Sequence, residues 1–176
     1  LVVTAGFWGG RTALISESIG NNPFFGLRFG PTYRASDKLT IRVNGNYSED
    51  NKDRGYVNTD SNGDIIFGVR YRTNVSYDLN VKYIFRNNLA LSFNGRHYWD
   101  RADYVSFHNL SDDGLMLDET TYDQNHDFTY NAVNIDLLFE WQFAPGSFLT
   151  LSWKNNIAQE AGIIVQKYSE NFKQNF

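Results

Sequence analysis

The most constraining feature of this chain is a very long run of alternating apolar and polar side chains. From residue 65 to residue 85, the odd positions are nearly all apolar and the even positions are mostly polar or glycine. A period of two predicts a β-strand with one apolar and one polar face. At ~3.4 Å per residue, about twenty residues reach about 70 Å, whereas most strands of globular proteins have roughly five or six residues. The pattern therefore predicts strands of unusual length.

The same alternation recurs along the chain, and the connections between the repeats alternate in length. It returns at 25–34, 39–48, 89–99, 133–143 and 149–157, and residues 1–8 fit part of one more strand. The connections at 36–38, 86–88 and 144–146 are short, whereas those at 9–22, 49–63 and 101–127 are long. Short turns at one end and long loops at the other are typical of outer-membrane β-barrels. No apolar run approaches eighteen residues, which excludes a transmembrane helix.

Alternation also predicts the register of two hairpins, because paired residues must point to the same side of the sheet. The favoured registers bring opposite charges together on the polar face. The predicted pairs are Phe85–Leu89, Tyr83–Leu91, Val81–Phe93, Asp78–Arg96, Phe143–Ser147, Trp141–Leu149 and Asp136–Lys154.

The division of residues between the faces favours a membrane barrel with its polar face inward. Aromatic residues gather near the short turns and again about ten residues further along, as in the two interfacial girdles of a bilayer crossing. The predicted lumenal residues are Arg28, Arg42, Arg70, Arg72, Asp78, Lys82, Arg96, Asp136, Glu140 and Lys154. The predicted lipid-facing residues are Phe29, Val81, Tyr83, Leu91, Phe93, Leu137, Phe139, Trp141, Leu151 and Trp153. A soluble barrel or sandwich with the apolar face inward is the alternative.

Composition excludes several other classes. The chain has no cysteine, so disulfides and cysteine-based metal sites are impossible within it. A net charge of −4 is not the basic footprint of a nucleic-acid-binding protein. Six full strands and part of a seventh are fewer than the about eight of the smallest closed membrane barrels. We therefore expect residues 1–176 to form part of a single barrel domain whose remaining strands lie elsewhere.

Three segments carry a family resemblance: residues 29–48, 81–93 and, most specifically, 134–153 with its Phe-Ala-Pro-Gly-Ser turn. They resemble the late barrel hairpins of large Bacteroidota outer-membrane proteins. Those proteins join an N-terminal carbohydrate-binding-like β-sandwich of the family nine type to a C-terminal β-barrel domain of unknown function. The resemblance implies a location in the outer membrane of a Gram-negative bacterium. It also implies an N-terminal sandwich and a closing strand outside this chain, and it transfers no catalytic residue.

The candidate sites are few, and each has a structural alternative. The segment 100–127 is strongly acidic, and Ca²⁺ prefers oxygen ligands. A solvated loop is the favoured interpretation there, and a calcium or carbohydrate contact is the alternative. His108 and His126 fall in the same segment, whereas His97 is expected beside Tyr77 on the apolar face as a girdle residue. The metal candidates are Asp112, Asp113, Asp118, Glu119 and Asp123.

The expected function follows mainly from the resemblance and from the long polar connections. We expect an outer-membrane barrel that anchors or assembles a cell-surface complex and that could handle glycans. A passive or gated transport channel is the alternative, because the polar face is rich in arginine. An outer-membrane hydrolase is the third interpretation, and we expect no catalytic residue and no cofactor other than Ca²⁺ in the acidic segment. The expected partners are outer-membrane lipid, proteins of a surface complex and carbohydrate, but not nucleic acid.

Overall fold

The computed structural model describes residues 1–12 and 22–161. These residues form strands and connections without a helix, so none of their elements is a helix long and apolar enough to cross a membrane. The strands are β1 (Val2–Thr12), β2 (Asn22–Arg34), β3 (Leu39–Thr59), β4 (Ile65–Arg86), β5 (Leu89–Leu110), β6 (Met116–Glu119), β7 (Phe128–Ala144) and β8 (Ser147–Ala161).

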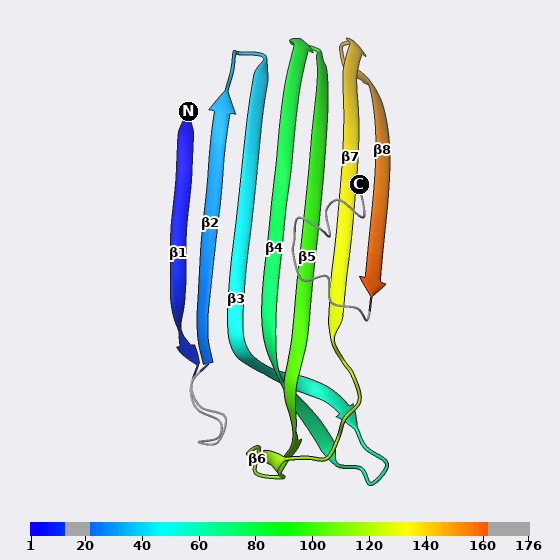
Figure 1. Ribbon diagram of the computed structural model, residues 1–176. Coiled ribbons are helices and arrows are strands. Elements are labelled where there is room, and N and C mark those ends of the chain that lie inside the picture. The colour runs from blue at the N-terminus through cyan, green and yellow to red at the C-terminus, as the bar shows by residue number, and fades with distance from the viewer. Residues whose placement is uncertain (13–21, 162–176) are drawn as a thin grey trace.

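The strands form one antiparallel sheet in the order β1-β2-β3-β4-β5-β7-β8, with β6 paired to the end of β5. Figure 1 shows the short turns at one end of the sheet, while β3, β4 and β5 run well past their neighbours at the other end. The predicted all-β antiparallel fold is confirmed. Within the described residues β1 and β8 do not pair with each other, so closure of the sheet into a barrel stays a prediction.

The predicted registers are confirmed along the strands and wrong at the last pair before each turn. Asp78 lies opposite Arg96 in β4–β5, and the pairs Tyr83–Leu91, Val81–Phe93, Trp141–Leu149 and Asp136–Lys154 also form. However, Leu89 pairs with Arg86 rather than Phe85, and Ser147 pairs with Ala144 rather than Phe143. In both hairpins the turn has two residues, and a register shift next to it absorbs one extra residue. The φ of +75° at Gly146 shows why glycine suits the second turn.

Two of the predicted long connections are mostly strand. β3 continues to Thr59, which leaves only residues 60–64 between it and β4. β5 continues to Leu110, and β6 follows after a short turn. The prediction of loops at 49–63 and 101–127 is therefore wrong in most of its length. For the connection predicted at 9–22, β1 and β2 occupy its two ends, and residues 13–21 lie outside the described residues.

Bulges explain why alternation did not reveal these strand extensions. The β3–β4 register shifts between Asp50 and Asp53 and again between Tyr56 and Asn58. Lys52 lies in the first shift and has a φ of +64°, a conformation that non-glycine residues adopt rarely. Each inserted residue reverses which positions face which side. The apolar–polar period is consequently broken in the sequence although the strand itself continues.

Burial divides the sheet into two parts. We call β1, β2 and residues 39–49, 75–96 and 133–161 the proximal half, since they lie closer to the short turns, and residues 50–74 and 97–132 the distal half. In the described residues, all buried hydrophobic and buried polar side chains belong to the distal half. Its core packs Val69 against Met116, with Phe67 and Leu110 around them. The proximal half is a single layer of sheet with both faces largely open.

Candidate functional site: the polar face of the sheet

The cross-strand register places the predicted lumenal residues together on one face of the sheet, which we call the polar face. Arg28 pairs with Asn46, Arg42 with Asn80, and Arg96 with Asn134 as well as Asp78. Paired side chains point to the same side, so β2, β3, β4, β5 and β7 all contribute to this face. The opposite, apolar face carries the predicted lipid-facing residues. It stays a prediction that the polar face borders a lumen and that the apolar face borders lipid.

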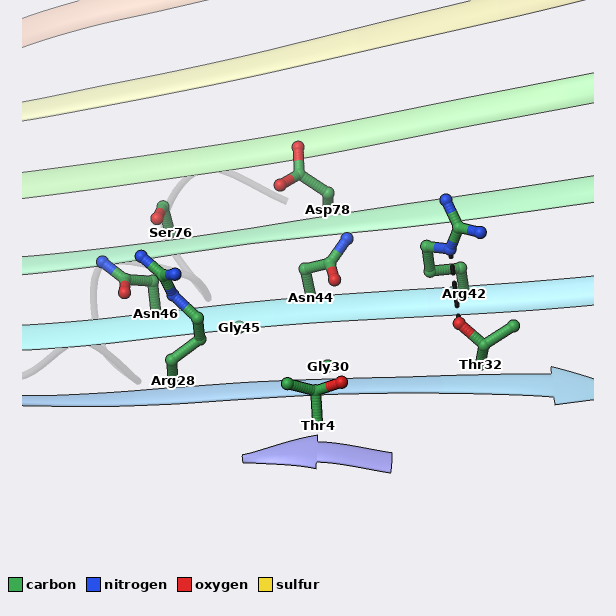
Figure 2. Close-up of a pocket in the computed structure, with 10 residues that line it drawn as sticks. All are labelled: Thr4, Arg28, Gly30, Thr32, Arg42, Asn44, Gly45, Asn46, Ser76 and Asp78. Carbon is green, nitrogen blue, oxygen red and sulfur yellow. Dashed lines mark hydrogen bonds between the residues drawn. The ribbon is translucent and has the colours of Figure 1, made fainter. Parts of the chain in front are cut away.

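The polar face has a hollow in its proximal half, with a volume of about 580 Å³. Four neighbouring strands, β1 to β4, supply its lining (Figure 2). The lining residues are Thr4, Arg28, Gly30, Thr32, Arg42, Asn44, Gly45, Asn46, Ser76 and Asp78. Nearly all of their side-chain polar groups are hydroxyls, amides or guanidiniums. The volume is in the range of roughly 300–1,000 Å³ that is typical of small-ligand sites.

The arginines of the polar face fall into two groups. In the hollow, Arg42 Nε donates to Thr32 Oγ1 at 3.3 Å, and the guanidinium of Arg28 lies 5.7 Å from the centre of the Trp8 ring. Among the described residues, Arg28 and Arg42 form no ion pair. By contrast, Arg96 Nε lies 2.6 Å from Asp78 Oδ1. Arg96 therefore links β4 and β5 through an ion pair, whereas Arg28 and Arg42 have no such pair within the described residues.

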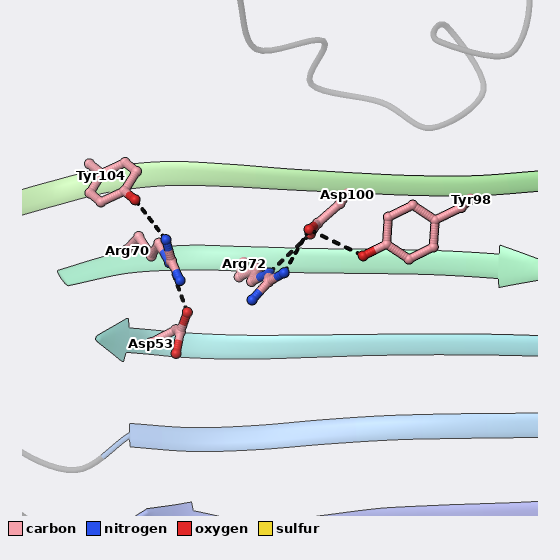
Figure 3. A network of polar contacts seen from close by, with 6 residues as sticks. All are labelled: Asp53, Arg70, Arg72, Tyr98, Asp100 and Tyr104. Atoms are coloured by element: carbon pink, nitrogen blue, oxygen red, sulfur yellow. Dashed lines mark hydrogen bonds and ion pairs between the residues drawn. The ribbon is translucent and has the colours of Figure 1, made fainter. Parts of the chain in front are cut away.

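The distal half of the polar face holds two separate ion-paired clusters on neighbouring residues, which together we call the ionic network (Figure 3). Arg70 Nε donates to Asp53 Oδ2 at 2.8 Å, and its Nη1 donates to the Tyr104 hydroxyl at 2.6 Å. Asp100 accepts two hydrogen bonds from Arg72, at 3.1 and 2.7 Å. Its side chain is only 6% exposed. This bidentate arrangement is the strong form of an arginine–carboxylate pair.

The network keeps both guanidiniums charged. The hydrogen bond to Asp100 raises the pKa of Arg72, against the opposing effect of burial. For Arg70, burial is the largest influence and lowers the pKa, but the hydrogen bond and charge of Asp53 outweigh it, and the net pKa is raised. Burial also raises the pKa of Asp50, as does the nearby charge of Asp53. Among the described residues Asp50 forms no ion pair, unlike Asp53 and Asp100.

A cluster of aromatic rings holds the segment that follows β6. The rings of Tyr104 and Phe107 on β5 stack at 5.6 Å between centres. Phe107 also contacts Tyr122 edge-on at 5.1 Å, and the Tyr122 hydroxyl lies 2.6 Å from His126 Nε2. Asp127 Oδ1 accepts from the backbone N–H of Tyr104 at 2.7 Å. The segment that follows β6 is thus anchored to β5 at both Phe107 and Tyr104.

The structure describes three of the five metal candidates, and it does not group them into a site. Asp112 and Asp113 are exposed in the turn between β5 and β6, and Asp123 is exposed beyond β6. The side chains of Asp118 and Glu119 lie outside what the structure describes. Within the described residues, no three His, Asp or Glu side chains are grouped so that they could hold a metal ion. The alternative of a calcium site therefore gains no support here.

The three histidines occupy separate places. His97 stacks at a tilt on Tyr77, with ring centres 5.1 Å apart, as predicted from the register. Its Nε2 also lies 2.6 Å from Asn131 Oδ1, and the ring is 3% exposed. The contact between Asn131 and His97 was not predictable from the sequence, because the connection between β5 and β7 is too long to fix the register of these two strands. His108 bridges Ser106 Oγ and the Leu117 carbonyl, each at 2.9 Å, and so ties β6 to β5.

Comparison with known proteins identifies the family. A family model matches residues 11–176 of the chain. The chain therefore belongs to the family described as a domain of unknown function (DUF5916). No curated protein and no solved structure matches the chain. This membership agrees with the domain of unknown function that the resemblance implies, whereas the family nine sandwich and the Bacteroidota origin stay predictions.

Proposed function

We propose that this chain is part of an outer-membrane β-barrel of the Bacteroidota type, which anchors a platform for a cell-surface complex. The observation that best supports this proposal is the distribution of buried side chains along the strands. A tilted strand crosses the hydrocarbon core with roughly 9–11 residues. The proximal half has about that length between the short turns and the first buried side chains of β5, His97 and Trp99. Beyond that length the chain has a packed core.

The apolar face of the proximal half supports a lipid environment. Large side chains stand open along it, including Phe29 at 52%, Leu151 at 58% and Trp153 at 54% exposure. Soluble monomers rarely expose a contiguous apolar surface above a few hundred Å². Polar groups on the same strands face the opposite side, as in barrels whose lumen is wet.

Aromatic side chains flank this apolar band. Near the short turns, Tyr83 packs edge-on against Phe85 at 4.7 Å, and Trp141 lies 5.8 Å from Phe143. At the other border, the half-buried Tyr47 lies on the apolar face of β3, about eight residues from the short turn between β2 and β3. Aromatic rings at both borders are the usual anchors of membrane proteins at the lipid–water interface.

The distal half supports assembly of a complex rather than transport alone. β3, β4 and β5 have 21, 22 and 22 residues, about twice the length that a membrane crossing requires. Their extensions are held by the ionic network and the aromatic cluster, and they still expose apolar side chains such as Val105 at 51%, Leu115 at 55% and Leu117 at 49%. An ordered surface with exposed apolar groups suits a protein partner.

Cysteine labelling of the full-length protein in intact cells tests the proposed orientation. The chain contains no cysteine, so Asn62→Cys at the tip between β3 and β4 and Asn87→Cys in a short turn introduce single sites. A membrane-impermeant maleimide is expected to label the first in intact cells and the second only after the outer membrane is permeabilised. Recovery of the protein in the soluble fraction, or equal labelling of both sites in intact cells, would contradict the proposal.

Cross-linking tests the platform itself. The double variant Leu115→Asp/Leu117→Asp is expected to abolish a discrete cross-linked complex at the cell surface. The matched control Asp112→Ser/Asp113→Ser, in the adjacent turn, is expected to retain it. If the complex survives in the first variant, the β6 region is not the contact surface.

A transport channel is the second candidate, favoured by the arginines of the hollow, which form no ion pair within the described residues. Planar-bilayer recordings of the full-length protein separate the two functions. Steady conductance that is lost in Arg28→Gln/Arg42→Gln would favour the channel over a purely anchoring role. The hydrolase alternative gains no supporting arrangement among the described residues.

A further inference from the structure

We propose that the hollow between Arg28 and Arg42 on the polar face binds an acidic oligosaccharide. The hollow lies in the proximal half, and binding there does not require the platform proposed for the distal half. The hollow has cationic groups at both ends and uncharged hydrogen-bonding groups between them (Figure 2).

The charge of the hollow favours an anion. Asp78 is the only carboxylate among the lining residues, and Arg96 already pairs with it at 2.6 Å. The guanidiniums of Arg28 and Arg42 form no ion pair among the described residues. Each guanidinium can therefore offer its planar set of donors to a carboxylate, the geometry that suits it best.

The spacing of the two arginines favours an elongated ligand. Arg42 pairs with Thr32, which is four residues along β2 from Arg28. At ~3.3 Å per residue the two positions are about 13 Å apart along the strand. Figure 2 shows the two guanidiniums at opposite ends of the hollow, where an elongated ligand can contact both and a small anion contacts one of them. A chain of sugar units with more than one carboxylate can contact both.

The groups between the arginines match sugar hydroxyls. Thr4, Asn44, Asn46 and Ser76 present hydroxyl and amide groups that can both donate and accept hydrogen bonds. Gly30 leaves space at the base of the hollow, because it has no side chain and a Cβ there would lie 3.1 Å from Asn44 Oδ1. A ligand with many hydroxyl groups could satisfy such a lining more fully than a simple inorganic anion.

An aromatic ring lies beside the Arg28 end. A Cβ on Gly26 would fall 2.2 Å from ring atoms of Trp8, so the indole lies directly on the backbone of Gly26. The ring is half-buried, and Arg28 stands against it. Sugar rings have an apolar C–H face that packs on aromatic rings and a polar edge that hydrogen-bonds. Trp8 next to the lining amides offers both kinds of contact.

Calorimetry with the full-length protein in detergent micelles tests the site, with trigalacturonate as the acidic probe. Maltotriose serves as the neutral sugar of the same length, and inorganic sulfate as the simple anion. We expect trigalacturonate to bind more tightly than both. Arg28→Gln and Arg42→Gln should each weaken its binding by roughly tenfold, as expected for one lost charge-assisted contact. Gly30→Val should weaken it by filling the hollow.

Arg34→Gln is the matched control, because it removes an exposed arginine of β2 that does not line the hollow. It should bind trigalacturonate like the wild type. Absence of binding, equal binding of sulfate, or unchanged binding in Arg28→Gln/Arg42→Gln would each overturn the proposal. Surface labelling at Asn62 is independent of these results, so failure of the site is distinguishable from failure of the proposed location.

Discussion

Replacing Asp100 by alanine should destabilise the protein much more than replacing Asp78, although each carboxylate pairs with one arginine. The Asp100 side chain is 6% exposed and accepts from Arg72 at 3.1 and 2.7 Å and from the Tyr98 hydroxyl at 3.3 Å. One hydrogen bond to a charged group contributes about 1.5–3 kcal/mol. Because Arg72 is 38% exposed, water screens the pair, and we expect a total loss of about 3 kcal/mol rather than the sum of the contacts.

The Asp78 pair provides the internal comparison. Asp78 and Arg96 are 34% and 67% exposed, although their atoms approach to 2.6 Å. Exposed pairs of this kind contribute about 0.2–1 kcal/mol. Asp78→Ala should therefore cost at most about 1 kcal/mol.

Urea unfolding of the full-length protein in detergent micelles, followed by tryptophan fluorescence, measures both losses. Trp99 is buried next to Asp100 and should report on the distal half. A double-mutant cycle with Arg72→Ala should give a coupling energy of about 1–2 kcal/mol, because the two side chains share their hydrogen bonds. Equal losses for Asp100→Ala and Asp78→Ala, or full additivity with Arg72→Ala, would refute the conclusion that burial gives the distal network its strength.

Three further predictions concern single contacts. Asn131→Ala removes the 2.6 Å hydrogen bond to the buried His97 ring and should lower the free energy of unfolding by about 1–3 kcal/mol in the same urea assay. Met116→Ala truncates a side chain that is 4% exposed and should cost about 2–5 kcal/mol, with faster proteolysis of the β5–β6 hairpin as the readout. Asp50→Asn should stabilise the protein at pH 7, because burial, and then Asp53, raise the pKa of this carboxyl. The free-energy cost of ionising Asp50 in the folded protein grows as the pH rises from the ordinary pKa of 3.8 through the folded-state value. The difference in urea midpoint between Asp50→Asn and wild type should therefore vanish near about pH 3, where Asp50 is protonated in both the folded and the unfolded state.

The proximal half was predictable because one rule governs it throughout. Its strands alternate without interruption, so face and register follow from counting residues, and Asp78–Arg96 and Asp136–Lys154 form as expected. The counting fails only beside the turns. There Phe85 and Phe143 are the extra residues of the register shifts, and a short loop can be closed with or without such a shift at similar cost.

The distal network was not predictable by the same rule. Asp53 and Arg70 have numbers whose sum is odd, so alternation assigns them to opposite faces of the β3–β4 hairpin. The register shift between Asp50 and Asp53 reverses that assignment and brings the two side chains within 2.8 Å. A bulge depends on tertiary packing and on a backbone conformation such as that of Lys52. Neither leaves a periodic signal in the sequence.

The contrast between the halves bears on function. A lumen that only conducts requires strands as long as the bilayer is thick, and loose loops would suffice to join them. Here the strands continue past that length, and three bulges turn a new set of polar and aromatic residues toward one another: two between β3 and β4, and one between β4 and β5 at Val105. Fixing these residues with partly buried ion pairs reduces the ordering that a partner would have to impose on binding. A preorganised surface of this kind is what an anchor for a complex requires, so the distal half argues for assembly more strongly than the arginines of the hollow argue for transport.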